Sequence, residues 1–214
     1  MAVSGVLLVL FILFHLAGNF SIFWGPETYN SYASHLRELG ILLWVARAGL
    51  LAAFITHVFF TVRLALANRA TRNTRYTVRV YAGGTNFVKL TMLYTGIMVF
   101  AFVCLHLHDF SFRDKSGPAS MVAGLSGGQS LGLYGLVWNA FANPTHATLY
   151  VIAVTAVGLH FSSAVSTIWV TLGVLTEQAT AKVNLAVRIL GALIALGFSS
   201  IPVYVLAATL LRGV

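Results

Sequence analysis

The chain has 214 residues, of which 58% are hydrophobic and only 8% are charged, and its formal net charge is +8. A soluble domain carries about 25% charged residues, so the composition excludes an ordinary water-soluble domain. Six of the thirteen basic residues fall between Arg63 and Lys89, which is typical of a cytoplasmic loop rather than of a nucleic-acid-binding face. The single cysteine, Cys104, excludes a disulfide framework and a C-x-x-C-H haem attachment.

The apolar segments predict an all-α membrane protein, a single domain of residues 1–214 with five transmembrane helices in a bundle. A spanning helix needs about 20 apolar residues. Segments of this kind occupy residues 3–23, 41–67, 89–112, 145–175 and 185–211. The first has neither a basic region before it nor a clear small-residue cleavage site, so we expect a span and not a cleaved signal peptide.

The connecting segments differ in character. Residues 24–40 are polar and mixed, and residues 113–129 are rich in Gly and Ser, which is typical of a flexible loop. Residues 131–143 contain interfacial aromatic residues and favour a short helix lying on the membrane surface or dipping slightly into it. Pro144 suits the first turn of the fourth span, and Pro202 is expected to kink the fifth.

The basic loop after the second span predicts the orientation. By the positive-inside rule, residues 63–89 face the cytoplasm. Because two spans precede this loop, the N-terminus is also expected in the cytoplasm. With five spans, the C-terminus is expected outside.

Histidines are the candidate chemical groups. Five of the seven lie in the predicted spans: His15, His57, His106, His108 and His160. A single buried histidine is commonly an interhelical hydrogen-bond partner, but four spans that each carry one favour a shared ligand role. The other two are His35, in the outer segment, and His146, at the outer end of the fourth span, and both are interpreted as ordinary interfacial residues.

Depth along the helices indicates how these histidines pair. At about 1.5 Å per residue, His15 lies roughly 13 Å, and His106 roughly 9 Å, from the outer ends of their helices. His57 lies about 9 Å before Arg63 at the inner boundary. His160, near the middle of its helix, pairs with His57 by elimination. Two pairs, one in each leaflet, suit two six-coordinate haems b that would relay electrons across the membrane.

The third span carries two histidines, and two arginines flank His57. Residues two apart on a helix point about 200° apart, so His106 and His108 cannot face one haem. His106, in the apolar run FVCLHL, is preferred as the ligand, and His108 is expected to meet a propionate or a quinone. Arg47 and Arg63 are candidate partners for haem propionates. For Arg63 the alternative is snorkelling to the cytoplasmic headgroups.

Five motifs occur in order along nearly the whole chain. They are FHLAGNF (14–20), THVFFTVRLALANRATRNTRY (56–76), VCLHLHDF (103–110), GLHFSSAVSTIWVTLG (158–173) and LGFSSIPVYV (196–205). Together they resemble the five-helix, dihaem cytochrome b anchor of succinate:quinone oxidoreductases, the b558 type that includes fumarate reductase anchors. The resemblance implies the same four iron ligands, His15, His57, His106 and His160.

The resemblance also implies a setting. The chain would be the membrane-anchor subunit of respiratory complex II, which serves the tricarboxylic acid cycle, in a bacterial cytoplasmic (inner) membrane. A flavoprotein subunit with FAD and an iron–sulfur subunit would dock on the cytoplasmic side. The haem of His57 and His160 would lie nearer the clusters, and the other would be distal. Menaquinone is the usual substrate of this family, and a higher oligomer of the complex is compatible with the resemblance. Whether the enzyme oxidises succinate or reduces fumarate stays open.

One position departs from some fumarate reductase anchors. These have an acidic residue two positions before the ligand histidine of the fourth helix, where this chain has Gly158. The glycine argues against a transmembrane proton route that depends on that acid.

Quinone reduction needs proton donors near the headgroup. Four candidates lie in the outer segment at the depth of the distal haem: Glu27, His35, Arg37 and Glu38. The alternative is a solvated loop. Two other functions stay open for the chain, namely the cytochrome b anchor of a hydrogenase or a formate dehydrogenase, and a non-haem proton-coupled transporter with a histidine relay.

Overall fold

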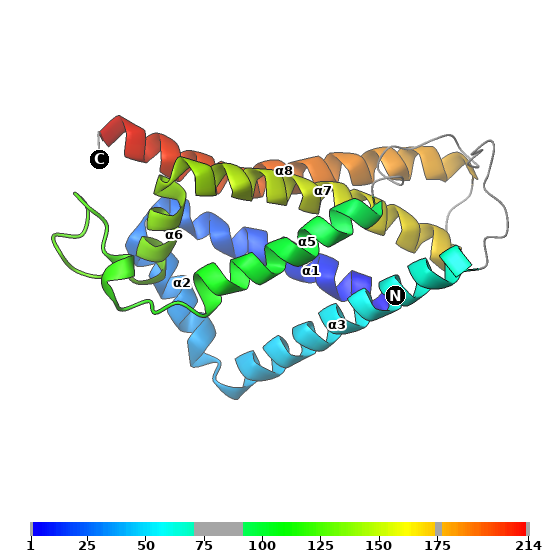
Figure 1. Ribbon diagram of the computed structural model, residues 1–214, viewed down its shortest axis with the longest axis horizontal. Coiled ribbons are helices and arrows are strands. Elements are labelled where there is room, and N and C mark those ends of the chain that lie inside the picture. The colour runs from blue at the N-terminus through cyan, green and yellow to red at the C-terminus, as the bar shows by residue number, and fades with distance from the viewer. Residues whose placement is uncertain (1, 71–91, 174–176, 213–214) are drawn as a thin grey trace.

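The computed structural model describes residues 2–70, 92–173 and 177–212, which form an almost wholly helical bundle (Figure 1). Within these ranges, five helices are long and apolar enough to cross a membrane, as the hydropathy predicted. They are α1 (Ala2–Asn19, continued by the 3-10 turn η1, Phe20–Trp24), α3 (Ile41–Ala70), α5 (Met92–His106, continued by the π-helical turn η2, Leu107–Ser111), α7 (Pro144–Leu172) and α8 (Glu177–Arg212). The described ranges contain no strand, only an isolated bridge between Met121 and Ser130.

Helices α7 and α8 pack closely along each other, and their glycines explain how. A methyl group on Gly158 would lie 2.5 Å from the carbonyl oxygen of Gly191, so the two backbones approach too closely for any side chain. The hydroxyl of Ser162, one turn further along α7, donates to the carbonyl oxygen of Gly158 at 2.9 Å. Gly158 therefore has a packing role, and a carboxylate side chain has no room at this position.

The other spans are arranged around this central pair. Helix α5 packs on α7, while α1 contacts α3, α7 and α8. Helix α3 packs mainly on α1 and lies at the edge of the bundle (Figure 1). The four helices that carry the span histidines thus surround a common interior.

One end of the bundle is closed by two shorter helices and the connecting loop (Figure 1). These helices are α2 (Pro26–Glu38) and α6 (Gly132–Ala142). The segment that forms α2 was expected only as polar and mixed. Its helix begins with a proline, which suits a first turn, and has Glu27 in that turn and Arg37 in the last, charges that oppose the helix dipole.

Helix α6 was expected on the membrane surface or dipping slightly into it, and within the protein it packs against its neighbours. Its aromatic residues Tyr134, Trp138 and Phe141 are buried in the hydrophobic core. They are covered because α2, α7 and α8 all contact this helix. The core of the described protein therefore lies at this end of the bundle.

The loop expected to be flexible is held by hydrogen bonds to its neighbours. The side-chain amide of Asn139 in α6 donates to the carbonyl oxygens of Ala119 and Met121, both at 2.8 Å. The backbone N–H of Leu131 donates to the carbonyl oxygen of Ser120 at 2.9 Å. A Gly- and Ser-rich composition therefore marks a turn-rich segment here, one that is packed against α6.

The last helix begins earlier than predicted. It was expected from residue 185, but α8 begins at Glu177, because EQATAKVN is rich in good helix formers. It continues without a break through Pro202 to Arg212. Much of the basic loop that predicts the orientation, with Arg72, Arg75, Arg79 and Lys89, lies outside the described residues.

Candidate functional site

The four preferred histidines form two facing pairs inside the bundle. His15 of α1 and His106 of α5 have ring centroids 5.7 Å apart, with the rings inclined at 89°. His57 of α3 and His160 of α7 have centroids 6.4 Å apart, with the rings inclined at 83°. We call these the α1–α5 pair and the α3–α7 pair. They are the same partners that depth along the helices indicated.

The two pairs lie at different levels of the bundle. The His106 ring lies 6.3 Å from the Tyr150 ring, and a methyl group on Gly96 would lie 3.2 Å from the His160 ring. Tyr150 and His160 are ten residues apart on α7, and Gly96 and His106 are ten apart on α5. Ten helical residues span about 15 Å, so both helices place the pairs about 15 Å apart along the bundle.

In the α3–α7 pair, a threonine lies beside one imidazole. The hydroxyl of Thr95 lies 3.4 Å from Nδ1 of His160 and donates to the carbonyl oxygen of Met92 at 3.1 Å. A His160 protonated at Nδ1 can therefore donate to Thr95, which leaves its Nε2 as an electron-pair donor. Nδ1 of the partner, His57, is buried and has no hydrogen-bond partner among the described residues.

In the α1–α5 pair, a short polar chain leads from α2 to one histidine. The phenol of Tyr29 donates to the side-chain oxygen of Asn19 at 3.0 Å. The amide nitrogen of Asn19 donates to the carbonyl oxygen of His15 at 2.8 Å and lies 3.3 Å from Nε2 of His15. Burial raises the pKa of Tyr29, which keeps this phenol a donor. Nδ1 of His106 is buried without a hydrogen-bond partner in the described chain.

Aromatic rings from four helices and one helical turn enclose the α1–α5 pair. The contacts with His15 or His106 come from Phe11, Phe102, Phe110, Tyr150 and Phe198. An enclosure of this kind excludes water and strengthens electrostatic and ligand interactions inside it.

The geometry suits an iron held between two imidazoles. A metal–imidazole bond is about 2 Å long, so two such bonds plus the ring radii place the centroids roughly 6 Å apart. Both observed separations, 5.7 and 6.4 Å, are close to this value. The buried Nδ1 atoms of His57 and His106 add nitrogens that lack a partner. The described residues contain no cluster of three or more His, Cys, Asp or Glu for a bare metal ion, whereas a haem needs only two axial ligands.

His108 stands apart from both pairs. Its side chain is 71% exposed, and its Nδ1 lies 3.3 Å from the carboxylate of Asp109. The structure therefore brings His106, and not His108, to the partner histidine on α1. A contact of His108 with a propionate or a quinone stays a prediction.

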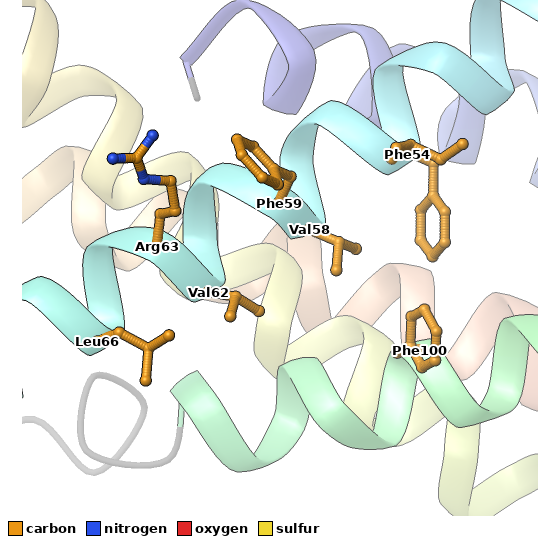
Figure 2. A pocket seen from close by; sticks show the side chains of 8 residues that line it. Phe54, Val58, Phe59, Val62, Arg63, Leu66 and Phe100 are labelled. Atoms are coloured by element: carbon orange, nitrogen blue, oxygen red, sulfur yellow. The ribbon is translucent and has the colours of Figure 1, made fainter.

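The two arginines considered as propionate partners, Arg47 and Arg63, have exposed side chains. The guanidinium of Arg47 lies 5.2 Å from the ring centroid of Trp44 on its own helix. Arg63 borders an apolar groove of about 570 Å³ between α3 and α5. Figure 2 shows the ring of Phe54 facing Phe100 of α5, with the Arg63 side chain turned away. The propionate role of Arg47 and Arg63 stays a prediction.

The four candidate quinone residues all lie on the exposed surface of α2. They are Glu27, His35, Arg37 and Glu38. Nδ1 of His35 lies 2.8 Å from the carbonyl oxygen of Ser31, one turn earlier in the same helix. The structure does not bring these four side chains to the α1–α5 pair, and their quinone role stays a prediction.

Sequence reasoning missed one polar cluster, centred on Asp109. Asp109 is the one acid of the chain's five that lies within the apolar stretch of a candidate span, since Glu177 precedes the apolar stretch of α8 (Ala179–Arg212). Its carboxylate accepts hydrogen bonds from Nε2 of His146 at 3.0 Å and from the phenol of Tyr150 at 2.8 Å. The hydrogen bond of His146 to Asp109 was not predicted, and its interfacial position stays a prediction. An acid in an apolar span, three positions after a ligand candidate, was the signal that could have identified this cluster.

Comparisons of the chain with protein-family models, with curated proteins and with solved structures found no match. The helices define the class, an all-α protein with five candidate membrane-spanning helices in its described residues. Any finer assignment rests on the histidine geometry and on the motif resemblance.

Proposed function

We propose that this chain is the membrane-anchor cytochrome b subunit of a succinate:menaquinone oxidoreductase, or respiratory complex II. It would hold two bis-histidine haems b and pass electrons between an iron–sulfur subunit and membrane quinone. The observation that carries the proposal is the pairing of four histidines from four helices, with ring separations of 5.7 and 6.4 Å.

Each part of the bundle has a defined task in this proposal. Bound haem would supply one-electron carriers within the apolar interior. The four histidines provide axial nitrogens, and Thr95 orients the His160 imidazole of the α3–α7 pair through Nδ1. A separation of about 15 Å between the pairs arranges them as a relay along the membrane normal.

The partners follow from the motif resemblance. A flavoprotein subunit with FAD and an iron–sulfur subunit would dock on the cytoplasmic side of a bacterial inner membrane. Arg63 and Arg69, near the end of α3, would mark that side. Menaquinone would react near the α1–α5 pair, with Glu27 and His35 on α2 as candidate proton donors.

Haem content tests the first half of the proposal. Pyridine haemochrome analysis of the purified chain should give two haems b per polypeptide, both low-spin in the optical spectrum. A colourless protein would contradict the proposal and would favour the rival function, a proton-coupled transporter that uses the same buried histidines as a relay.

Co-purification tests the second half. We expect a flavoprotein and an iron–sulfur subunit, with succinate dehydrogenase activity in the isolated complex. A nickel- or molybdenum-containing partner would contradict this assignment. It would instead indicate the anchor of a hydrogenase or a formate dehydrogenase, for which the same pairs of histidines would serve equally well.

A further inference from the structure

Asp109 is the centre of a polar cluster inside an otherwise apolar part of the bundle. Its side chain is only 12% exposed. One carboxylate oxygen accepts hydrogen bonds from His146 and Tyr150 of α7, and the other lies 3.3 Å from Nδ1 of His108. A carboxylate in a spanning segment is costly unless it is satisfied, so a position of this kind is expected to have a function.

The backbone that carries Asp109 is unusual and begins at a candidate ligand. Helix α5 ends at His106 and continues as the π-helical turn Leu107–Ser111. The backbone N–H of Phe112 closes this turn by donating to the carbonyl oxygen of Leu107 at 3.1 Å. Single π-helical turns commonly occur at functional sites, where they redirect side chains.

The cluster connects this turn to the first turns of α7. Helix α7 begins at Pro144, and the side chain of Asn143 accepts a hydrogen bond from the backbone N–H of His146 at 3.1 Å. This cap fixes the turn from which the His146 imidazole reaches Asp109. The carboxylate therefore joins two spans at one level of the bundle.

Tyr150 carries this connection to the α1–α5 pair. Its hydroxyl is held by Asp109, while its ring lies 6.3 Å from the His106 ring and 5.9 Å from the Phe110 ring. Phe110 also lies 5.3 Å from His106, so these three rings form one mutually contacting cluster. Asp109 thus fixes both the turn that follows His106 and one of the rings that pack against it.

We propose that Asp109 is a positioning residue for the α1–α5 pair. Through His146 and Tyr150, its carboxylate holds the π-helical turn against α7 and so sets the placement of the His106 imidazole. The inference rests on the proposed function, because it assigns Asp109 to one of the two haem sites. Its specific consequence is that Asp109 acts on the α1–α5 site and leaves the α3–α7 site unchanged.

The test is the rate at which each haem leaves the purified chain for apomyoglobin, with the two spectral components followed separately. The α1–α5 component is the one that His106→Ala removes. Asp109→Ala should accelerate its loss roughly 10- to 100-fold, the usual effect of removing a group that orients a metal ligand. The α3–α7 component should be lost at the unaltered rate.

Two more conservative variants keep the test informative if Asp109→Ala fails to fold. Asp109→Asn keeps one acceptor oxygen, and Tyr150→Phe keeps the ring but removes the hydroxyl. Both should accelerate loss of the same component, by less than Asp109→Ala. The matched control is Asp114→Asn, because Asp114 is exposed and accepts hydrogen bonds from its chain neighbours Ser116 and Lys115. This control should change neither rate.

The outcomes separate the two proposals. Unaltered chain without haem would overturn the proposed function and this inference together. Two haems in the unaltered chain, with equal acceleration of both components in the variants, would show that Asp109 merely stabilises the fold and would overturn the inference alone. No acceleration in Asp109→Asn and Tyr150→Phe would overturn it as well.

Discussion

The two histidine pairs have unequal surroundings. The α1–α5 pair is enclosed by aromatic rings. Beside it, Asp109 connects the turn after α5 to α7 by hydrogen bonds. The α3–α7 pair is bordered by Thr95 and by Gly96, and its α3 member stands on a helix at the edge of the bundle. The first pair is therefore surrounded more fully by the protein than the second, whose α3 member lies on a helix that packs mainly on α1.

Removal of the two proposed haems should reveal this difference between the pairs most strongly. A ligand at a thousand times its Kd stabilises the folded state by about 4 kcal/mol, so depletion should destabilise the chain by a similar amount. Backbone amides of Ile41–Ala70 should gain hydrogen exchange well before those of α5, with α8 as the internal reference. Faster exchange in α5 than in α3 would contradict the expectation that α3 depends more on bound haem.

Gly96→Ala should damage the α3–α7 site alone. The new methyl group would lie 3.2 Å from Cε1 of His160, and overpacking of this kind costs about 1–3 kcal/mol. The α3–α7 spectral component should broaden or become high-spin, while the other is retained. Gly49→Ala is the matched control, because a methyl group there meets open space. Equal spectral changes in both variants would exclude a specific contact with His160.

Thr95→Val should have the smallest effect of the three. It preserves the shape of the side chain and removes the hydroxyl beside Nδ1 of His160, a loss worth about 1 kcal/mol. The midpoint potential of the α3–α7 component should shift without loss of haem. Thr155→Val serves as the control, since that hydroxyl bonds only to the Val151 carbonyl on its own helix. A potential shift confined to the α1–α5 component would contradict the assignment of Thr95.

The five helices and the histidine partners could be predicted because both follow from local properties. Hydropathy marks a span residue by residue, and a fixed rise per residue converts sequence position into depth. No periodicity encodes contacts between distant segments. The side-chain amide of Asn30 in α2, for example, donates to the carbonyl oxygen of Leu131 at 2.8 Å, a contact that helps to bury α6. The bonds from Asp109 to His146 and Tyr150 are equally non-local.

The pairing of spectral components in the four ligand variants is the most direct test of the account. His57→Ala and His160→Ala should remove one and the same component. His15→Ala and His106→Ala should remove the other, and His108→Ala should retain both. Membrane insertion and assembly of each variant would be established first. Loss of the same component in His57→Ala and His15→Ala, with survival of the other, would contradict the account.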